Sequence, residues 1–468
     1  MRFYNTFSKT KEEFIPQNPP TVSFYTCGPT VYDYFHIGNA RSFIMADVIR
    51  RYLEYKGYDV KFVMNLTDVD DKIIKKSIEE KSTPKAIADF YANAFFEDIK
   101  KLKIKSATIF PKATQHIHEM IELIKDLEKK GVAYNVDGNV FYDVTKFPEY
   151  GKLSGKNLDE LSVGARVEVN DQKRNPLDFA LWKKAKEGEP SWDSPWGKGR
   201  PGWHVECSAM SSKHLGDTID IHAGGNDLIF PHHENEIAQS EAAHGHKFVR
   251  YWIHFGFLNI NEEKMSKSLG NFLTAREILK KYSAEAIRLF FLQTYYGGPL
   301  NFSFELLAAA EKGVEKIKNL SERIESEIKK DDNVGTVPDF NIKQYYEEFE
   351  KVMDDDINTP QAVALIFDLI RTANKIISDF NNINVSFYKD LKKFLTDTAE
   401  NVFGIIHFEE LNKKSTQLDE KLINLILDLR TKLKKQKNYE MADLIRDELN
   451  KLGIELKDGK DGTIYKFM

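Results

Sequence analysis

Cysteine is scarce in this sequence, with only Cys27 and Cys207 among 468 residues. Two cysteines so far apart cannot form a disulfide framework, which excludes the small disulfide-rich secreted class and predicts a cytoplasmic protein. No apolar run approaches the length needed to cross a bilayer, so we expect no membrane partner. The first residues, MRFYNTFSKTKEEF, have no apolar stretch followed by a small-residue cleavage site, and we expect no secretory leader there.

A strong net charge of either sign is also missing. The formal charge of -5 neither indicates nor excludes a nucleic-acid partner, because local patches decide that question. Hydrophobic residues at 41% and charged residues at 30% are typical of a globular protein. The length exceeds what one hydrophobic core usually covers, so we expect two to four domains.

A strand, a loop, a helix and a second strand follow one another near the start of the chain. Residues 22–26 alternate apolar and polar side chains, residues 27–35 form a loop, and apolar residues recur at helical spacing from 39 to about 56. Gly57 ends this helix. The apolar stretch YDVKFVMNLTD then indicates a strand buried on both faces. This unit predicts a Rossmann-like, doubly wound α/β fold with a parallel sheet.

The remaining chain divides into further regions. Residues 113–200 contain a helix and an Asp137-Gly138 hairpin signal, and they are interpreted as an inserted connective region. It separates two halves of the Rossmann-type domain, 1–112 and 201–273. Helical patterns fill 274–405, and 418–468 forms a small α+β module with two helices and a hairpin. Thr274 with Glu277 and then Ser283 are predicted helix caps.

The two cysteines raise the question of a metal site. Cys207 is followed by PHHENE, in which His232 and Glu236 are four residues apart. If a helix starts at Pro231, these two side chains share one face. Two Cys, one His and one Glu would satisfy a tetrahedral Zn²⁺. The alternatives are two inert buried cysteines, or His233 in place of His232 as the ligand.

The turn His36-Ile37-Gly38-Asn39 joins the first predicted strand to the first helix. This is the carboxyl edge of a parallel sheet, where such folds bind ligands. Free backbone N–H groups at a helix N-terminus suit phosphate, and His36 and Asn39 can each donate a hydrogen bond to it. Gly38 would allow a close backbone approach. A purely structural capping turn is the alternative.

A Ser- and Gly-rich loop, EEKMSKSLGN, follows a later apolar strand and carries Lys264 and Lys267. Two lysines on a loop can stabilise the negative charge of a leaving pyrophosphate. An ordinary solvated loop is the alternative interpretation.

These motifs together resemble the class I aminoacyl-tRNA synthetases. The resemblance includes a His-Ile-Gly-Asn turn, an insertion and a later Lys-Met-Ser-Lys-Ser loop, in that order. Cys27, GWHVEC and FPHHENEIAQS make it specific to the cysteinyl-tRNA synthetase family, and it extends over essentially the whole chain. Asn39 departs from the more common His in the first motif, which favours an electrostatic role over proton transfer.

The resemblance implies one zinc ion per chain at the base of an amino-acid pocket, with the thiolate of L-cysteine as its further ligand. A soft thiolate is a good zinc ligand, whereas a serine hydroxyl is poorer and harder to deprotonate. The implied metal ligands are Cys27, Cys207, His232 and Glu236. The implied pocket residues are Gly28, Thr30, Thr67, Trp203 and Asp227, with Asp227 pairing with the substrate ammonium.

The resemblance also implies cysteine activation by ATP with Mg²⁺, release of pyrophosphate and transfer of cysteine to the 3′ end of tRNA(Cys). The implied catalytic residues are His36, Asn39, Lys264 and Lys267. The implied ATP-binding residues are His36, Gly38, Asn39, Gly224, Gly225 and Lys267.

The end of the chain resembles an anticodon-binding module. Its predicted tRNA contacts are Arg430, Lys434, Lys435 and Tyr465, although a charge run is often only a solvated helix face. The family resemblance predicts a monomer. Two rival functions are an ATP-dependent ligase of cysteine to an amino sugar, which would not need this tail, and a non-catalytic zinc-bearing RNA-binding module.

Overall fold

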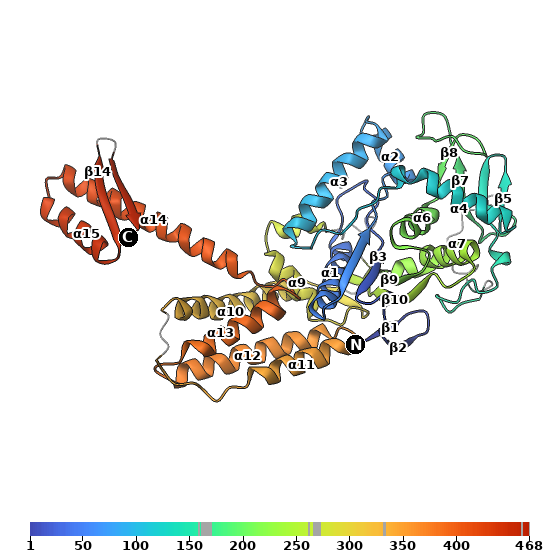
Figure 1. Ribbon diagram of the computed structural model, residues 1–468. Coiled ribbons are helices and arrows are strands. Elements are labelled where there is room, and N and C mark those ends of the chain that lie inside the picture. Colours follow the sequence, from blue (N-terminus) through green and yellow to red (C-terminus); the bar gives the residue numbers. More distant parts are fainter. Residues whose placement is uncertain are drawn as a thin grey trace. The chain divides into compact units, whose positions relative to one another are not determined.

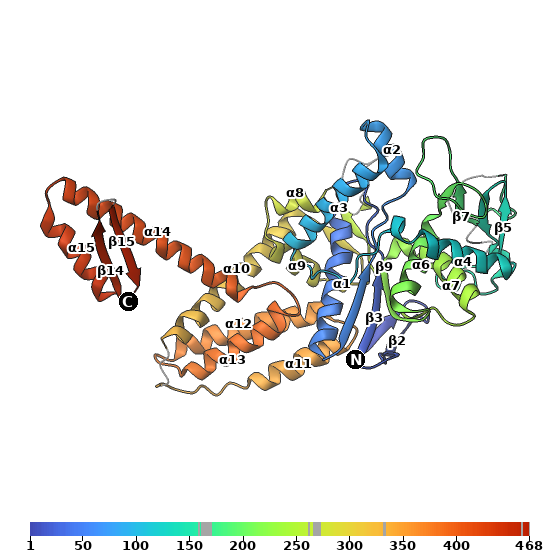
Figure 2. The same cartoon turned by 45° about the horizontal axis from the view of Figure 1, so that its top comes forward.

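A four-stranded parallel sheet lies in the first of two units, Met1–Ile406 and His407–Met468, into which the computed structural model divides. The structure describes residues 1–157, 160, 171–260, 263–264, 273–330, 334–459 and 462–467. The sheet order is β10 (Val249–Phe255), β9 (Ile219–Gly225), β3 (Thr21–Thr26) and β4 (Asp59–Met64). Helices α1 (Ile37–Tyr55) and α6 (Trp203–Leu215) lie on opposite sides of the strands (Figures 1 and 2). The predicted doubly wound fold is confirmed.

The chain order reverses between β3 and β9. From the central strand β3 the chain continues to β4 on one side, and the later strands β9 and β10 are added on the other side. In open parallel sheets the crevice beyond such a reversal binds ligands. The loops that follow β3 and β9 therefore mark the position of a candidate site.

Helix α1 begins with a reciprocal capping box. The Asn39 backbone N–H donates to His36 Nδ1 at 3.1 Å, and the His36 backbone N–H donates to Asn39 Oδ1 at 3.4 Å. The helix thus starts at Ile37, two residues before the predicted start, because these side chains satisfy backbone donors of its first turn. Gly57 follows the helix with a φ of +86°, as its predicted role as terminator requires.

Arg41 connects this helix to two loops by hydrogen bonds to backbone carbonyls. Its Nη1 donates to Gly256 O and Phe257 O at 2.8 and 2.9 Å. Its Nη2 donates to the carbonyls of Tyr295, Tyr296 and Gly298 at 3.2, 3.4 and 2.7 Å. The side chain is 1% exposed, and burial lowers its pKa to about 10, so it stays charged at neutral pH. A forked guanidinium can satisfy all these acceptors at once.

Replacing Arg41 with lysine is expected to lower the free energy of unfolding by about 3 kcal/mol, because one ammonium cannot satisfy the same carbonyls. Chemical unfolding would measure the change. The control is Arg2→Lys, where the exposed ion pair with Asp355 at 2.8 Å predicts a loss of at most about 1 kcal/mol. Equal losses in the two variants would contradict this assignment.

The inserted region forms its own antiparallel sheet of β5 (Ala133–Val136), β6 (Asn139–Tyr142), β7 (Phe179–Lys184) and β8 (Gly199–Pro201), with α4 (Ile117–Lys129) beside it. The turn of the first hairpin has positive φ at both Asp137 (+52°) and Gly138 (+93°), as a type I′ turn requires, so the predicted hairpin is confirmed. Stacked rings of Tyr142 and Phe179, 5.0 Å apart, lie in its core.

The other elements of the first unit are mostly helical. The side chains of Thr274 and Ser283 cap α8 and α9 as predicted. The strands are β1 (Arg2–Asn5), β2 (Thr10–Glu13), β11 (Leu258–Ile260), β12 (Glu263–Lys264) and β13 (Leu300–Phe302). The helices are α2 (Asp71–Glu79), α3 (Pro84–Lys101), α7 (Glu234–His244), α8 (Ala275–Leu279), α9 (Ala284–Leu292), α10 (Phe304–Lys329), α11 (Ile342–Asp354), α12 (Thr359–Asp379) and α13 (Val385–Leu395).

The second unit contains α14 (Phe408–Lys435), α15 (Tyr439–Lys451) and a hairpin of β14 (Ile454–Gly459) and β15 (Gly462–Phe467). The predicted start of this module, residue 418, lies inside α14. Among the described helices of the chain, none combines the length and apolarity of a membrane span.

Arg430 of α14 is 1% exposed, and it donates from Nε to Ala442 O at 3.1 Å and from Nη1 to Thr463 Oγ1 at 3.3 Å. The prediction that Arg430 contacts tRNA phosphate is therefore wrong, because its guanidinium holds α15 and the hairpin instead. The position of Lys435 is exposed and that of Lys434 is half-buried, whereas the Tyr465 side chain lies outside the described part.

Candidate metal centre and active site

The two cysteines meet at the carboxyl end of β3. The Sγ atoms of Cys27, which follows β3, and Cys207 on α6 are 4.0 Å apart. Glu236 Oε1 lies 3.8 Å from Cys27 Sγ and 2.9 Å from His232 Nε2. One donor atom from each of these four residues lies within 4.8 Å of the others, and all but half-buried Cys27 are buried. The structure thus brings the four predicted ligands together.

The spacing of these donors fits a tetrahedral ion. With Zn–S bonds of about 2.3 Å, two thiolates at tetrahedral positions lie about 3.8 Å apart, close to the observed sulfur separation. His232 also contacts His204 through Nδ1 at 3.0 Å, so its other ring nitrogen is oriented toward the cluster. Two sulfurs with one imidazole and one carboxylate are a donor set that suits Zn²⁺.

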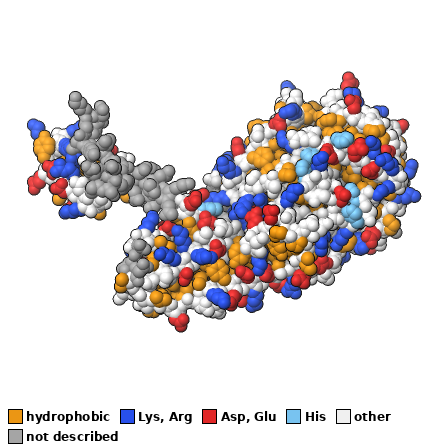
Figure 3. Space-filling view, viewed as in Figure 1, with side chains coloured by type: hydrophobic (Ala, Val, Ile, Leu, Met, Phe, Trp, Pro, Cys, Tyr) orange, Lys and Arg blue, Asp and Glu red, His pale blue; other side chains and the backbone are white. Residues whose placement is uncertain are grey.

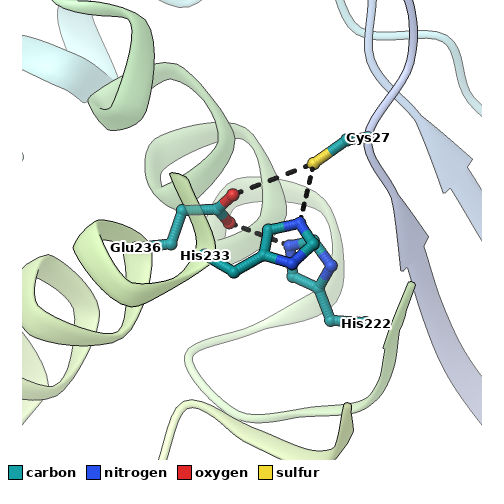
Figure 4. Close-up of side chains that lie close together, drawn as sticks. All are labelled: Cys27, His222, His233 and Glu236. Atoms are coloured by element: carbon teal, nitrogen blue, oxygen red, sulfur yellow. Dashed lines mark hydrogen bonds and ion pairs between the residues drawn. The ribbon is translucent and has the colours of Figure 1, made fainter. Parts of the chain in front are cut away.

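A second set of donors overlaps the first. Figure 4 shows Cys27 and Glu236 with His222 of β9 and His233. His233 Nε2 lies 3.4 Å from Cys27 Sγ, and His222 Nε2 lies 2.8 Å from Glu236 Oε2. The first set contains two soft sulfur donors and the second contains one, which favours the first for zinc. His222 would then orient the Glu236 carboxylate from outside the ligand set.

The pKa values of the cluster residues are shifted by burial and by their neighbours. A hydrogen bond from Cys27 is the main cause that lowers the pKa of Cys207 to about 6, whereas desolvation raises the pKa of Cys27. Burial alone would raise the pKa of Glu236, but His222 and His232 outweigh it and lower that pKa to about 2. These shifts favour the anionic forms of Cys207 and Glu236, which in turn outweigh burial and raise the pKa of His232 to about 10.

The helix that carries Glu236 follows an interruption of the backbone at Phe230. Regular α7 starts at Glu234, and the preceding turn over Ile229–His233 is interrupted by Phe230, whose backbone is extended at φ -136° and ψ 131°. Phe230 is the non-helical residue of that turn, and the residues from Pro231 continue helically into α7, so the predicted helix start is confirmed. His232 and Glu236 therefore contact each other on one face of the helix.

The predicted amino-acid pocket residues come from several elements, and Trp203 contacts the cluster through His232. The Trp203 ring, 39% exposed, stacks on His232 with centroids 4.2 Å apart. Thr30 and Thr67 pair as a short parallel bridge after β3 and β4. A Cβ on Gly28 would lie 1.8 Å from the carbonyl oxygen of Asn65, so only glycine fits there. Asp227 is exposed in the short helical turn that follows β9.

The predicted phosphate site lies on the first turn of α1. In neutral His36, Nδ1 accepts from the Asn39 backbone, so the ring proton is on Nε2, where it can be donated. The Asn39 oxygen is used in the capping box, which directs its NH₂ group to other acceptors. Gly224 and Gly225 are the last two residues of β9, and a Cβ on Gly224 would lie 2.7 Å from His233 Cε1. This close packing is a structural reason for a glycine at position 224, in addition to its predicted role in ATP binding.

The two predicted catalytic lysines are only partly placed. Lys264 belongs to β12, but its side chain lies outside the described part, and Lys267 lies outside the described residues altogether. The described residues that precede and follow the two lysines in the sequence are hydrogen-bonded to α1. Arg41 binds the carbonyls just before β11, and the Ile37 backbone N–H donates to Leu273 O at 3.0 Å.

Sequence reasoning missed His222, His254 and Asn65. His254 of β10 contacts His233 Nδ1 at 2.8 Å and Thr6 Oγ1 at 2.8 Å, so it holds the His233 ring. The available signal was a histidine inside each of two apolar strands, where a buried polar side chain needs a partner. Asn65 gave no comparable signal, since an asparagine after a strand is common.

Comparisons with known proteins agree with this geometry. The family described as tRNA synthetases class I (C) catalytic domain matches residues 13–312, and the DALR domain matches residues 348–407. The chain is 50% identical to a cysteine–tRNA ligase of Thermococcus gammatolerans, with 100% of this chain and 99% of that protein covered. It is 49% identical to the cysteine–tRNA ligase of Carboxydothermus hydrogenoformans, with both chains covered completely.

Solved structures share the fold at low sequence identity. Mycobacterium tuberculosis methionyl-tRNA synthetase in complex with methionyl-adenylate aligns with a TM-score of 0.61 at 19% identity, over 82% of this chain and 89% of that one. The Agrobacterium radiobacter K84 agnB2 LeuRS in its ternary complex aligns with a TM-score of 0.62 at 12% identity, over 85% and 86%. With a catalytic-domain match over more than half of the chain and full-length relatives near 50% identity, the chain belongs to the cysteine–tRNA ligase family of class I aminoacyl-tRNA synthetases.

Proposed function

We propose that this chain activates L-cysteine with ATP and transfers it to the 3′ end of tRNA(Cys), and that Cys27, Cys207, His232 and Glu236 hold one Zn²⁺ that recognises the substrate thiolate. The observation that carries the proposal is the convergence of these four donors at the carboxyl end of β3, whose following loop leads to the first turn of α1. The proposed thiol site and the proposed phosphate site would then lie at the two ends of that loop.

The metal, when bound, would supply a Lewis acid that stabilises a thiolate ligand at neutral pH. The residues of this chain determine what else fits. Trp203, stacked on His232, would form a wall of the pocket, and the Gly28 backbone N–H donates to Asn65 Oδ1 at 2.8 Å. A serine substrate would offer only a hydroxyl, which is a poorer ligand and harder to deprotonate. This difference removes the need for a separate editing step.

Activation joins a cysteine carboxylate oxygen to the α-phosphorus of ATP while the bond from that phosphorus to pyrophosphate breaks. The nucleophile is already ionised, so catalysis consists of positioning and charge stabilisation. His36, Gly38 and Asn39 would bind phosphate oxygens at the N-terminus of α1. Gly224 and Gly225 would lie against the adenosine, and Lys264 and Lys267 would stabilise the departing pyrophosphate with Mg²⁺.

In the second step the 2′-hydroxyl of the terminal tRNA adenosine attacks the carbonyl carbon of the adenylate. The carbonyl–phosphate bond then breaks and AMP leaves. The matched DALR domain and the second unit support a tRNA substrate. Family membership also supports a monomer in the cytoplasm.

The tRNA contacts in the second unit are proposed to come from Lys434, Lys435 and Tyr465. On the face shown in Figure 3, Lys and Arg side chains of the first unit are interspersed with Asp and Glu, which favours local contacts over a broad basic surface.

Replacing Lys434 and Lys435 together with alanine is expected to raise KM for tRNA about tenfold. The slope of the logarithm of the tRNA-binding constant against the logarithm of salt concentration should become shallower by roughly two. Exchange of pyrophosphate without tRNA should not change. Lys451→Ala, an exposed cation of the same unit paired with Glu448 at 2.7 Å, is the control. An unchanged KM in the double variant would show that these lysines form only a solvated helix face.

To test the function itself, the full chain is incubated with cysteine and ATP and with either tRNA or an amino sugar as the acceptor. Cysteine is expected to appear on tRNA alone. Transfer to the amino sugar without charging of tRNA would instead favour the related sugar ligase.

A further inference from the structure

The turn between α11 and α12 has a backbone conformation that its residues rarely adopt. Asp356 and Ile357 have φ values of +67° and +51°, and their exposed fractions are 1% and 0%. A β-branched residue is strained in this region, so the surrounding contacts must hold the turn in place. The buried polar side chain in this turn is that of Asp356, and its partners indicate what the turn does.

The Asp356 carboxylate accepts three hydrogen bonds from segments that are far away in the sequence. Its Oδ1 accepts from the Tyr4 backbone N–H at 2.7 Å and from the Tyr296 hydroxyl at 2.5 Å, and its Oδ2 accepts from the Tyr295 hydroxyl at 2.7 Å. The Asp356 backbone N–H also donates to Arg2 O at 3.0 Å. The turn, which lies in the region matched by the DALR domain, thereby holds both β1 and the segment that follows α9.

The segment held by Asp356 is also the one that orients Arg41. Three backbone carbonyls within residues 295–298 accept from Arg41 Nη2. Residues 297 and 298 are both glycine, which leaves this backbone many conformations unless other contacts restrict it. The hydrogen bonds from two adjacent tyrosine hydroxyls to one buried carboxylate supply such a restriction.

From this segment the connection reaches the strand that contains Lys264. Arg41 Nη1 donates to the carbonyls of Gly256 and Phe257. The Gly256 backbone N–H donates to Tyr296 O at 2.9 Å. These residues lead directly into β11, and β11 pairs with β12, which includes the backbone of Lys264. A displacement of the segment after α9 would therefore move the start of β11 and, through it, β12.

We propose that Asp356 is a positioning residue for cysteine activation, which holds residues 295–298 so that Arg41 and β11 place β12 beside the departing pyrophosphate. This inference rests on the proposed function and deepens it, because it assigns part of the activation machinery to the turn between α11 and α12. A misplacement of about 1 Å can lower a reaction rate by up to about a hundredfold. Loss of the Asp356 carboxylate is thus expected to act on the chemical step more than on cysteine binding.

The test uses Asp356→Gly in the full chain, because glycine adopts a φ of +67° without strain and lacks the carboxylate. Single-turnover formation of the adenylate is expected to slow about tenfold, whereas KM for cysteine in pyrophosphate exchange should stay within about twofold of the parent. Transfer of cysteine from the preformed, enzyme-bound adenylate to tRNA should also stay within about twofold, since pyrophosphate has already left. A chain that is merely less stable would be slower in both steps.

Two further variants identify the hydrogen bonds concerned. Asp356→Asn keeps an acceptor for the Tyr4 N–H, and asparagine tolerates a positive φ, so the rate of adenylate formation should stay within about threefold of the parent. Tyr295→Phe combined with Tyr296→Phe should slow adenylate formation as Asp356→Gly does. Adding both tyrosine changes to Asp356→Gly should cause no further loss, because the same hydrogen bonds are removed.

The matched control is Asp355→Asn in the same turn. Asp355 forms exposed ion pairs with Arg2 at 2.8 Å and with Lys11 at 3.0 Å, and the rate of adenylate formation should not change when they are lost.

An unchanged rate of adenylate formation in Asp356→Gly or in the double tyrosine variant would overturn the inference. An equal slowing of the transfer step would also overturn it, because the carboxylate would then support only the fold. A parent chain that lacks cysteine-dependent exchange would overturn the proposed function itself, and this inference with it. The parent assay therefore separates the two failures.

Discussion

Replacing Cys207 with serine is expected to release the bound metal and to lower cysteine-dependent pyrophosphate exchange about a thousandfold, equivalent to about 4 kcal/mol. Cys207 is one of the proposed ligands, and a hydrogen bond from Cys27 lowers its pKa to about 6, which favours its thiolate. A serine hydroxyl would be a hard, protonated and weaker donor at the same position. Metal content by atomic emission and exchange rates on the same samples measure the effect.

The control for this variant is Ser208→Ala, one residue further along α6. Ser208 is 1% exposed, and its hydroxyl finds no hydrogen-bond partner in the described structure. Its removal should leave metal content and exchange unchanged. Exchange that persists in a Cys207→Ser protein without metal would contradict the proposed recognition of the substrate thiol.

Replacing Lys267 with alanine is expected to slow cysteine activation about a hundredfold or more with little change in cysteine affinity. A cation beside the departing pyrophosphate acts mainly on charge that develops in the transition state, so its loss lowers kcat more than binding. The described neighbours of this stretch support a place near the phosphates. Leu273 accepts from Ile37 N, and Thr274 pairs with His36.

The matched control is Lys280→Ala, an exposed cation after the same stretch. Single-turnover formation of the adenylate separates the chemical step from binding and release. A normal rate in the Lys267 variant would show that the stretch only connects β12 to α8.

Local sequence patterns were sufficient to predict many of the strands and helices. The period of the apolar residues located β3, α1 and β4, and short-range hydrogen bonds explain why the caps at Thr274 and Ser283 could be predicted. The helix start at Pro231 could also be predicted, because proline suits the first turn of a helix.

The candidate site depends on contacts between distant segments. Cys27 and Cys207 are 180 residues apart, and their meeting could be named in advance only through the family resemblance. The roles of Arg41 and Asn65 come from hydrogen bonds to loops far along the chain or to a neighbouring strand. Arg430 shows the reverse error, since a cation within a charged run is in fact buried against Ala442 and Thr463.

The central claim is that a metal held by the Cys27–Cys207 cluster identifies the substrate by its thiol. Pyrophosphate exchange by the full chain, with cysteine or serine and with metal removed and then restored, tests it most directly. The account predicts exchange with cysteine only, its loss when the metal is removed and its recovery with Zn²⁺. Exchange with serine at a comparable rate, or with cysteine in metal-free protein, would contradict it.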